Sequence, residues 1–556
     1  MEEYEIHKID LKTLEVKEAE KEKPKPSGFG KTMQDIMGFI LKYNPIDPIN
    51  DFARKVLSKF DLEDKFVALN WWGWAFPWIR YICRAYWNLR VEGEMFPEYG
   101  GIIYCTNHVS HIDPFFVSAA IQRRVEWMSK EENFETPLMR TLFKNLGAFP
   151  VKRGEKDEWA YNKATKVLEK GGVLGMFPEG TRSYDGTIGE FRSGSIRLAI
   201  ENEVPIVPGC VIGSKNALPK GKLVMKPATV TVRVGEPIYY DGYYGKDISY
   251  EQAQRLAAEL REKVVELHEL DNLDEIKYDS ELSIGGPTDA VKSEKRFNIK
   301  DILNPKKIVK NALTLVDDWW YGLLRSLEVF DTRSHFQEAI YNFSGNLVHE
   351  VAKNMIPYKT IDFDKYIPEE GGIVVCPSHN SEWDVIILAV SMQQHRRIMW
   401  QMAKQSLFDP IKVPIVNAWV RTHHAFPLKR GMHDVGCFEY GRELCEKGEM
   451  VCVYPEGTTN TGGGEVLPFH TGAVRMAIQA KVPILPVGIT GSENIYPKHG
   501  KMLNFGKGCV LKAGEPFMEH AKYFDEIMPN YEVLKDLSNK LRDRVVDLLL
   551  YNTPEY

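Results

Sequence analysis

Two short stretches of the chain each carry a histidine followed five residues later by an aspartate. They are Asn107-His-Val-Ser-His-Ile-Asp113 and Ser378-His-Asn-Ser-Glu-Trp-Asp384, and each follows a short apolar run. A neutral imidazole is the usual general base near pH 7, and a carboxylate on its other nitrogen fixes the tautomer. A His at the end of a strand can meet an Asp at the start of the next helix around a turn. Each pair therefore predicts a general base that removes the proton from an alcohol as the alcohol attacks an acyl carbonyl. The predicted catalytic residues are His108, Asp113, His379 and Asp384.

Other interpretations of these stretches are weaker. A single pair is equally consistent with a helix-capping Asp beside a structural His, but its repetition favours catalysis. His108 and His111 have the H-x-x-H spacing of metal ligands, yet the second stretch has Glu382 in place of His111. No Cys or carboxylate cluster completes a site, so we expect no metal. Ser110 lacks the strained G-x-S-x-G setting of a covalent nucleophile, which favours direct attack by the substrate alcohol.

A second polar block, Phe177-Pro-Glu-Gly-Thr-Arg-Ser183, has the composition of an anion site. Its glycine permits a tight turn with exposed amides, and its arginine can hold a phosphate with two hydrogen bonds. Its glutamate is expected to organise the site by accepting hydrogen bonds from substrate or from the backbone. The alternative is an ordinary strand-to-helix turn with solvated cations. The predicted binding residues of this half are Lys152, Arg153, Glu179, Gly180, Thr181 and Arg182.

These blocks belong to a plan that the chain contains twice. Six blocks recur in the same order, shifted by 271 to 279 residues; one is Ala148-Phe-Pro-Val-Lys-Arg-Gly154, which returns as Ala425-Phe-Pro-Leu-Lys-Arg-Gly431. Two copies of one domain explain this order, whereas a solenoid needs more repeats of a shorter unit. The corresponding binding residues of the second copy are Lys429, Arg430, Glu456 and Gly457.

Composition and periodicity predict a globular α/β protein. The 556 residues are 44% hydrophobic and 27% charged, and short apolar runs alternate with helical segments such as 161–170 and 195–202. This alternation predicts two domains, each a mixed, largely buried sheet flanked by helices. A capping box, Ser249-Tyr-Glu-Gln252, opens an amphipathic helix to residue 270. The expected divisions are a disordered arm 1–30, membrane-associating helices 31–94, domain 1 over 95–271, a linker 272–300, a helical segment 301–360 and domain 2 over 361–556.

Charge and cysteine usage narrow the functional classes. The net charge of −6 is mild and gives no indication of nucleic-acid binding. The eight cysteines form no C-x-x-C pair and several lie in apolar runs, which favours reduced, buried thiols in a cytoplasmic protein. The acidic N-terminus lacks the apolar region of a secretory signal.

An aromatic segment precedes the first domain. Residues 66–79 and Trp87 hold five of the 12 tryptophans. The run is too short and too interrupted for a spanning helix, which needs about 20 apolar residues. Trp prefers the headgroup level of a bilayer, where Arg80, Arg84 and Arg90 would meet lipid phosphate. We therefore expect a peripheral, monotopic membrane contact; the alternative is an aromatic helix packed on a core.

With these blocks identified, the chain resembles the glycerolipid acyltransferase family, the PlsC-like lysophosphatidic acid and glycerol-3-phosphate acyltransferases. The matching blocks are 107–113, 147–153, 177–183 and 204–208, and the likeness covers about 95–270 and 365–550. It implies transfer of a fatty acyl group from acyl-CoA or acyl carrier protein, as donor substrates rather than cofactors, to glycerol 3-phosphate or a lysophospholipid in phospholipid synthesis. The expected place is the cytoplasmic face of a membrane. On this resemblance His108 and Asp113 are the catalytic pair, and Arg153, Glu179, Gly180 and Arg182 contact the acceptor.

The second copy departs from the family pattern. Asn107, His111 and Arg182 are replaced by Ser378, Glu382 and Thr459. Because the His–Asp pair survives, an altered acceptor, glycerol-based or not, is favoured over an inactive domain. Two arrangements stay open. Either both copies acylate, in sequence, or one is catalytic and the other is a non-catalytic lipid-binding or scaffold domain.

Overall fold

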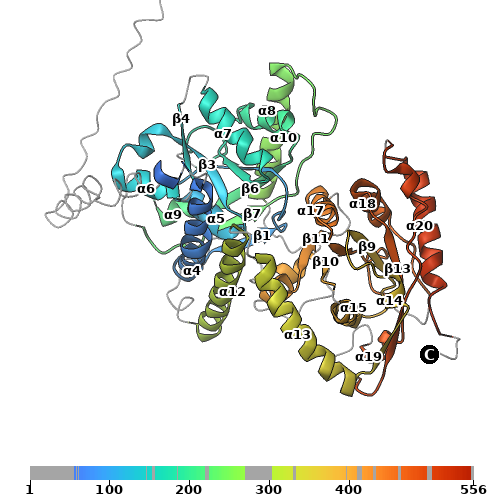
Figure 1. Ribbon diagram of the computed structural model, residues 1–556. Helices are drawn as coiled ribbons and strands as arrows, with labels where there is room; N and C mark the ends of the chain where they lie inside the picture. The colour runs from blue at the N-terminus through green and yellow to red at the C-terminus, as the bar shows by residue number, and fades with distance from the viewer. Residues whose placement is uncertain are drawn as a thin grey trace, which may run out of the picture.

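In the described part of the chain, each half builds a seven-stranded sheet with the same topology (Figure 1). The strand orders are β1-β7-β6-β2-β5-β3-β4 and, read from its opposite edge, β8-β14-β13-β9-β12-β10-β11. Neighbouring strands run parallel except β6 with β7 and β13 with β14. The predicted pair of mixed sheets is therefore confirmed. This computed structural model describes residues 55–57, 59, 62–145, 147–152, 157–183, 186–218, 225–269, 304–329, 333–395, 397–409, 416–429, 434–460, 465–496, 504–526 and 528–551.

The central strands are buried on both faces, as parallel strands covered by helices require. The first sheet consists of β1 Arg90–Gly93, β2 Ile102–Thr106, β3 Val125–Lys130, β4 Phe149–Val151, β5 Val173–Met176, β6 Ile206–Ile212 and β7 Thr231–Val234. The second consists of β8 Tyr358–Ile361, β9 Ile373–Pro377, β10 Met399–Lys404, β11 Ala425–Leu428, β12 Met450–Cys452, β13 Ile484–Thr490 and β14 Cys509–Ala513.

Helices cover both faces of each sheet and form two apolar cores per domain. In domain 1, α4 Phe76–Tyr86 and α5 Asp113–Ala120 cover one face, and α7 Glu158–Glu169, α8 Gly194–Glu201 and α10 Tyr250–Glu269 cover the other. In domain 2 the corresponding helices are α13 Arg333–Met355 and α15 Trp383–Gln394, then α17 Val435–Glu446, α18 Gly472–Ala480 and α20 Tyr531–Val546. Shorter elements are α3 Glu63–Leu69, η1 Asn70–Ala75, η2 Glu131–Phe134, α6 Pro137–Asn145, α9 Ser214–Ala217, α14 Phe363–Tyr366, η5 Gln405–Phe408, α16 Val416–Thr422, α19 Ser492–Ile495 and η6 Ala521–Tyr523.

The start of α10 shows how sequence determines one of these helices. The Oγ of Ser249 accepts from the Gln252 amide at 3.1 Å, and the Gln252 Oε1 accepts from the Ser249 amide at 2.9 Å. This is the predicted capping box, which satisfies two amides at the helix N-terminus. The apolar stripe of Leu256, Leu260 and Val264 is then buried against the sheet.

Each sheet begins earlier than the sequence boundaries predicted. Strand β1 lies inside the expected helical region 31–94, and β8 begins inside the expected helical segment 301–360. Arg90 pairs with Thr231 and Tyr358 with Cys509, so both four-residue strands belong to the sheets. They are too short for a visible alternation of polar and apolar residues. The predicted arm 1–30 and linker 272–300 lie outside the described residues.

Helix α12, Pro305–Val329, joins the two domains through adjacent aspartates. Asp318 pairs with Arg80 and Arg84 of α4 at 3.2 and 3.1 Å. Asp317 turns the other way and accepts hydrogen bonds from Asn417 and Ala418 of α16, at 2.6 and 3.0 Å. The expectation that Arg80 and Arg84 meet lipid phosphate is therefore wrong, because both side chains are buried in this ion pair.

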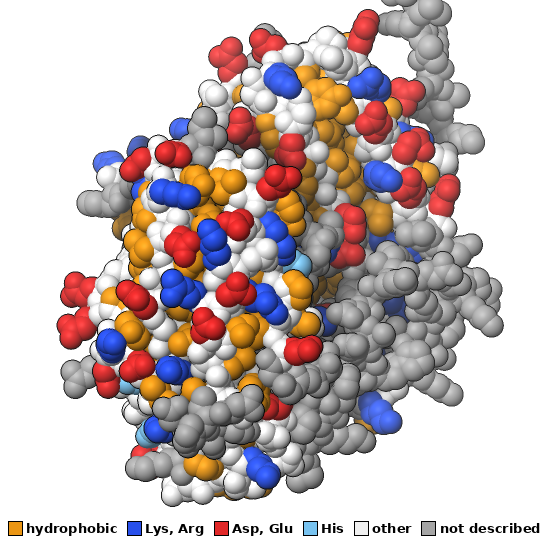
Figure 2. Space-filling model, turned by 90° about the vertical axis from the view of Figure 1, so that its right-hand side faces the viewer, with side chains coloured by type: hydrophobic (Ala, Val, Ile, Leu, Met, Phe, Trp, Pro, Cys, Tyr) orange, Lys and Arg blue, Asp and Glu red, His pale blue; other side chains and the backbone are white. Residues whose placement is uncertain are grey.

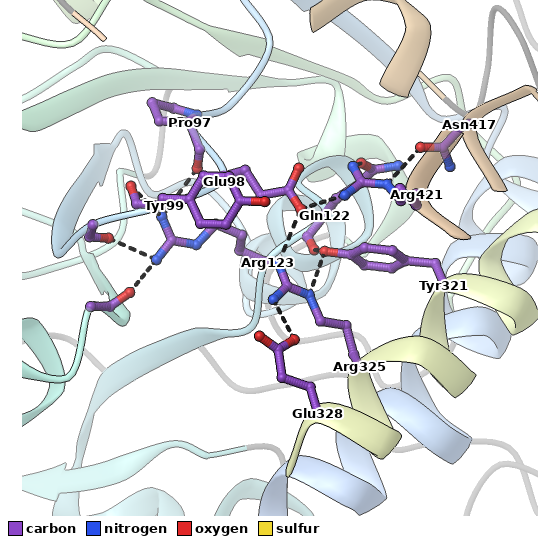
Figure 3. Close-up of polar contacts among 12 residues, drawn as sticks. Pro97, Glu98, Tyr99, Gln122, Arg123, Tyr321, Arg325, Glu328, Asn417 and Arg421 are labelled. Atoms are coloured by element: carbon purple, nitrogen blue, oxygen red, sulfur yellow. Dashed lines mark hydrogen bonds and ion pairs between the residues drawn. The ribbon is translucent and has the colours of Figure 1, made fainter. Parts of the chain in front are cut away.

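A buried polar network around Glu98 completes the junction (Figure 3). Its Oε1 accepts from Arg325 of α12 at 3.2 Å and from Arg421 of α16. Arg421 also donates to Asn417 at 2.7 Å and to Gln122 at 3.3 Å. A carboxylate of domain 1 is thus shared by cations from the joining helix and from domain 2, which fixes the two domains relative to each other.

The aromatic segment divides between the two predicted alternatives. The side chains of Trp71, Trp72 and Phe76 are all buried, and they pack with Tyr321 of α12 in one cluster. Trp78 is 44% exposed and lies edge-on to Trp319, with ring centroids 6.2 Å apart. Part of the segment is thus core, and part is a surface aromatic pair. In the described residues no helix is both long and apolar enough to cross a bilayer.

The cysteines and the surface charges also bear on the sequence predictions. All eight cysteines are buried and free, as predicted. Burial raises the pKa of the Cys83 and Cys105 thiols to about 12, so these thiols stay protonated at neutral pH. On the face shown in Figure 2, acidic and basic side chains are interspersed with apolar patches rather than gathered by sign.

Candidate active site

The His108–Asp113 pair forms at the turn between β2 and α5. The His108 Nδ1 lies 2.9 Å from the Asp113 Oδ2, and the same oxygen accepts from the amides of Val109 and Ser110, each at 2.8 Å. Three bonds to one carboxylate oxygen fix the turn and hold the imidazole. The Asp113 side chain is fully buried, whereas 15% of the His108 side chain is exposed. The Nε2 is therefore the nitrogen left for substrate.

The second pair repeats this geometry. The His379 Nδ1 lies 3.2 Å from the Asp384 Oδ2, which also accepts from the amides of Asn380 and Ser381 at 2.7 and 2.8 Å. Here the imidazole is less accessible, with 6% of the His379 side chain exposed. The two copies share the bonds of the pair and differ in its surroundings.

Glu179 connects the third block to the His–Asp turn. Its Oε1 accepts from the His108 amide at 2.9 Å, and its Oε2 accepts from the Gly189 amide at 3.0 Å. Glu456 does the same in domain 2, accepting from His379 and Leu467 at 2.7 and 2.8 Å. Burial raises the pKa of both carboxyl groups. Both glutamates thus accept from the backbone, one of the two partners expected from the sequence.

An aromatic stack supports the first histidine. The His108 ring lies 3.9 Å from the Phe177 ring, and Phe177 lies 4.8 Å from Trp127, all nearly parallel. A Cβ at Gly175 would approach the Trp127 ring to 2.6 Å, so this position must be glycine for the stack to form. In domain 2, Cys452 takes that place, and Tyr454 alone lies against His379 at 4.2 Å with a tilted ring.

Two arginines lie beside the turns that form the site, and the Ser183 amide next to one of them donates to the His108 carbonyl at 2.8 Å. Arg182 lies close enough to His111 to lower its pKa, although burial is the larger cause. Gly180 has a φ of +71°, and a Cβ there would meet the guanidinium of Arg192 at 3.0 Å. Sequence reasoning missed Arg192; its signal was the block Phe191-Arg-Ser-Gly, which returns as Phe469-His-Thr-Gly. A cluster of this charge suits an anionic substrate.

The remaining predicted binding residues are placed unevenly. Lys152 is exposed, and its amide donates to Asp157 at 2.9 Å. Lys429 in domain 2 is drawn across the junction, with its Nζ 2.8 Å from Glu94 of domain 1. Thr181 is exposed next to Gly180, and Gly457 repeats the left-handed turn with a φ of +71°. Arg153 and Arg430 lie outside the described residues.

Asn107 and Ser378 are different residue types, but each forms side-chain hydrogen bonds with the backbone of the neighbouring strand. Asn107 accepts from the Val211 amide at 2.7 Å and donates to its carbonyl at 3.1 Å, which ties the turn to β6. Ser378 accepts from the Ile489 amide at 2.9 Å on β13. This substitution therefore preserves the hydrogen bond to the neighbouring strand. Among the described residues, no group of three or more His, Cys, Asp or Glu side chains is arranged to hold a metal ion.

Comparison with known proteins agrees with this geometry. A family model described as acyltransferase matches twice, over residues 88–212 and 360–490. A Limnanthes douglasii relative named 1-acyl-sn-glycerol-3-phosphate acyltransferase is 34% identical over 144 residues, 25% of this chain and 51% of the relative. A Bacillus subtilis relative of the same name is 30% identical over 187 residues, 33% of this chain and 83% of the relative.

The overlap differs among these relatives. The chain spans about half the length of the plant relatives it matches, 51% for both Limnanthes species and 53% for Cocos nucifera. The crystal structure of PlsC, the 1-acyl-sn-glycerophosphate acyltransferase of Thermotoga maritima, aligns over 42% of this chain and 93% of that one, with 24% identity and a TM-score of 0.31. From the two family matches and the 83% coverage of the Bacillus relative, this chain belongs to the acyltransferase family, with its domain duplicated.

Proposed function

We propose that the chain is an O-acyltransferase that moves a fatty acyl group from an acyl thioester to the hydroxyl of 1-acylglycerol 3-phosphate. The observation that carries this proposal is the His108–Asp113 pair, closed at 2.9 Å beside a cluster of cations. Relatives named for this reaction support the choice of acceptor. Acyl-CoA and acyl carrier protein are the two donors considered, and glycerol 3-phosphate is a second acceptor to test.

The chemistry follows from the protonation of His108. With Nδ1 directed at Asp113, the Nε2 is a base that removes the proton from the acceptor hydroxyl as its oxygen attacks the thioester carbonyl. The C–O bond forms, the C–S bond breaks, and the imidazolium returns the proton to the thiolate that leaves. Asp113 keeps its negative charge throughout and stabilises the imidazolium. The Gly180 amide already donates to the Phe177 carbonyl at 2.9 Å, so the oxyanion would need the following amides of the same turn.

The cations next to the pair account for a phosphate-bearing acceptor. Arg182 and Arg192 flank the turn at Gly180, and Lys152 lies at the end of β4. A phosphate held there would place a glycerol hydroxyl within a few bonds of His108. Arg182 has five N–H donors in a planar fork, the geometry that matches a phosphate.

We place the protein on a lipid surface through α4 and α12. Five large apolar side chains of these two helices are exposed to solvent, each over more than a third of its surface. They are Trp78, Ile82, Val309, Val316 and Trp319. The first two turns of helix α12 carry the exposed Lys306 and Lys310, cations suited to anionic headgroups. Trp side chains favour the headgroup level of a bilayer, so this face supports a peripheral location.

The experiment that tests this function compares two variants of the full chain. Acyl transfer from acyl-CoA to 1-acylglycerol 3-phosphate is followed by lipid product analysis for His108→Ala and His379→Ala. We expect His108→Ala to lower the rate by roughly 10²–10⁴, the usual contribution of a general base. Transfer unchanged in both variants would refute the assignment of the pair. Thiol release without any acceptor would indicate a thioesterase instead.

A further inference from the structure

A cavity of about 670 Å³ adjoins the His108 turn in domain 1. Asn107 and Val109, the neighbours of His108 in sequence, line it together with residues of β6, α9 and α10. Its other walls include Ile212, Lys215 and His268. Neither His111 nor Arg182 of the cationic cluster belongs to this lining. The lining is mixed, with apolar side chains such as Val211 and Val265, the cations Lys215 and Arg261, and one carboxylate, Glu269. A cavity of this size beside the base, with cations in its lining, suits a second, phosphate-bearing substrate.

The corresponding place in domain 2 is identified by matched hydrogen bonds. Ser110 donates to the Leu218 carbonyl and Ser381 to the Tyr496 carbonyl, which equates α9 with α19. The guanidinium of Arg261 in α10 donates to the Ile188 carbonyl, and that of Arg542 in α20 donates to the Val466 carbonyl. In this register, Asn380 is the structural equivalent of Val109, and Thr490 is the structural equivalent of Ile212.

In domain 2 the chain itself enters this place. Helix α10 continues to Glu269, whereas α20 ends at Val546, and the 547–551 segment turns onto the sheet. The Leu550 amide donates to the Thr490 Oγ1 at 3.1 Å, and the Asn380 Nδ2 donates to the Tyr551 hydroxyl at 3.2 Å. The segment thus contacts the counterparts of two residues that line the open cavity of domain 1. Leu550 is 3% exposed, so the segment is buried at this point and does not lie free on the surface.

Charge and accessibility change in the same direction. Glu493 occupies the position of Lys215, which replaces a cation by an anion. The side chain next to this place, His379, is 6% exposed, against 15% for His108. An anionic ligand would therefore meet a filled place with Glu493 in domain 2. Among the described residues of domain 1 it would meet a cavity that has Lys215 there instead, with Glu269 also in its lining.

We propose that the cavity of domain 1 binds the phosphopantetheine arm of the acyl donor, and that the 547–551 segment closes the same place in domain 2. Only one domain of the chain then accepts the donor, and the second His–Asp pair is kept from it. This inference rests on the proposed acyl transfer for the identity of the ligand. The phosphopantetheine arm is common to CoA and to acyl carrier protein, so it does not decide between the two donors.

Binding stoichiometry tests the inference without relying on catalysis. CoA, and in a parallel arm phosphopantetheinylated acyl carrier protein, is titrated into the full chain by calorimetry. We expect one site per chain. Lys215→Glu should weaken that site by at least about tenfold, because it inverts a charge that contacts phosphate. The matched change Glu493→Lys, made alone, should leave the count at one because the segment still fills the place.

The decisive variant combines Glu493→Lys with Leu550→Ala and Tyr551→Ala. These changes remove the buried Leu550 side chain and the Tyr551 contact with Asn380, so a second site should appear while the domain 1 site is retained. The retained site also reports that the chain is folded. Two sites in the unmodified chain, a count that stays at one in the triple variant, or no site for either probe would overturn the inference. If the unmodified chain binds CoA at one site but transfers no acyl group to 1-acylglycerol 3-phosphate, the proposed function is wrong and the binding inference stands.

Discussion

The two domains contain the same reaction centre in different surroundings. In both, one aspartate oxygen forms hydrogen bonds with the histidine ring and with two backbone amides. In both, a glutamate holds the turn by accepting hydrogen bonds from two further backbone amides. Around it, domain 1 has an arginine, a stacked aromatic support and an open cavity. Domain 2 has a threonine, a tilted tyrosine and the 547–551 segment. An intact His–Asp pair is therefore no sufficient sign of activity, because the hydrogen bonds that form the pair also hold the turn in place.

The second lesson concerns why the pair survives in both copies. Asp384 accepts from the backbone amides of Asn380 and Ser381 in addition to His379. Its loss would leave two buried amides without an acceptor, at about 1–3 kcal/mol each. A carboxylate there is retained for stability whether or not the domain reacts.

The largest expected difference between the domains concerns the aspartates. Asp113→Asn should lower kcat by roughly 10²–10⁴, because an amide no longer holds the imidazole in the right tautomer or stabilises its charge. Asp384→Asn should leave kcat within about twofold if domain 1 does the chemistry. Initial rates at saturating donor and acceptor measure both. Equal losses in the two variants would mean that both domains react.

The junction is the next strongest test, because it asks whether the two domains behave as one body. Arg421→Met leaves Glu98 with one of its two cations in a buried site, and should cost about 3–5 kcal/mol of unfolding free energy. Urea unfolding followed by Trp fluorescence measures it. The matched control is Lys429→Met, whose ion pair with Glu94 is partly exposed and should be worth at most about 1 kcal/mol. Similar effects in both variants would argue against the buried network as the main link.

Arg182 and Thr459 test the difference in acceptor binding. Arg182→Gln should raise KM for 1-acylglycerol 3-phosphate by roughly 10–100-fold, since a hydrogen bond to a charged group contributes about 1.5–3 kcal/mol. The donor KM should not change, because the cavity assigned to the donor has a separate lining. Thr459→Arg restores the guanidinium in domain 2 and should alter neither constant while the 547–551 segment is in place. A gain of transfer from Thr459→Arg alone would show that the segment is no barrier.

Sequence reasoning worked where two copies gave an internal control. The duplicated sheets, the His–Asp contact and the backbone bonds of Glu179 all recur in the second copy. The capping box at Ser249 occurs once, and it was predictable because its chemistry is local. The positions of β1 and β8 could not be read from four-residue strands, which carry too little pattern. Arg80 and Arg84 were misplaced because their partner, Asp318, lies over 230 residues away in sequence and on a helix without a recognisable motif.

The features that distinguish the domains are also non-local. Glycine at position 175 matters only because Trp127 from another strand lies on it. Tyr551 matters only because its hydroxyl reaches Asn380, and nothing in the local sequence of either residue indicates that contact. Motifs therefore identified the shared centre, while the surroundings that separate the two domains needed the fold.

The smallest expected effect is on the acid sensitivity of domain 2. His520 is fully buried with its Nε2 2.9 Å from the Val482 carbonyl, and burial lowers its pKa, as it does for His423. The folded domain then binds a proton less well than the unfolded chain. The free energy of folding that depends on the neutral histidine is fully present above its unfolded pKa of about 6.5. This contribution is lost as the pH falls below that value. His520→Gln keeps a donor for the Val482 carbonyl without titrating, so the unfolding midpoint should fall less steeply between pH 7 and pH 5. Hydrogen exchange, read separately on peptides of each domain, should place this change in domain 2. An unchanged slope, or one that changes in domain 1, would mean that other groups set its acid sensitivity.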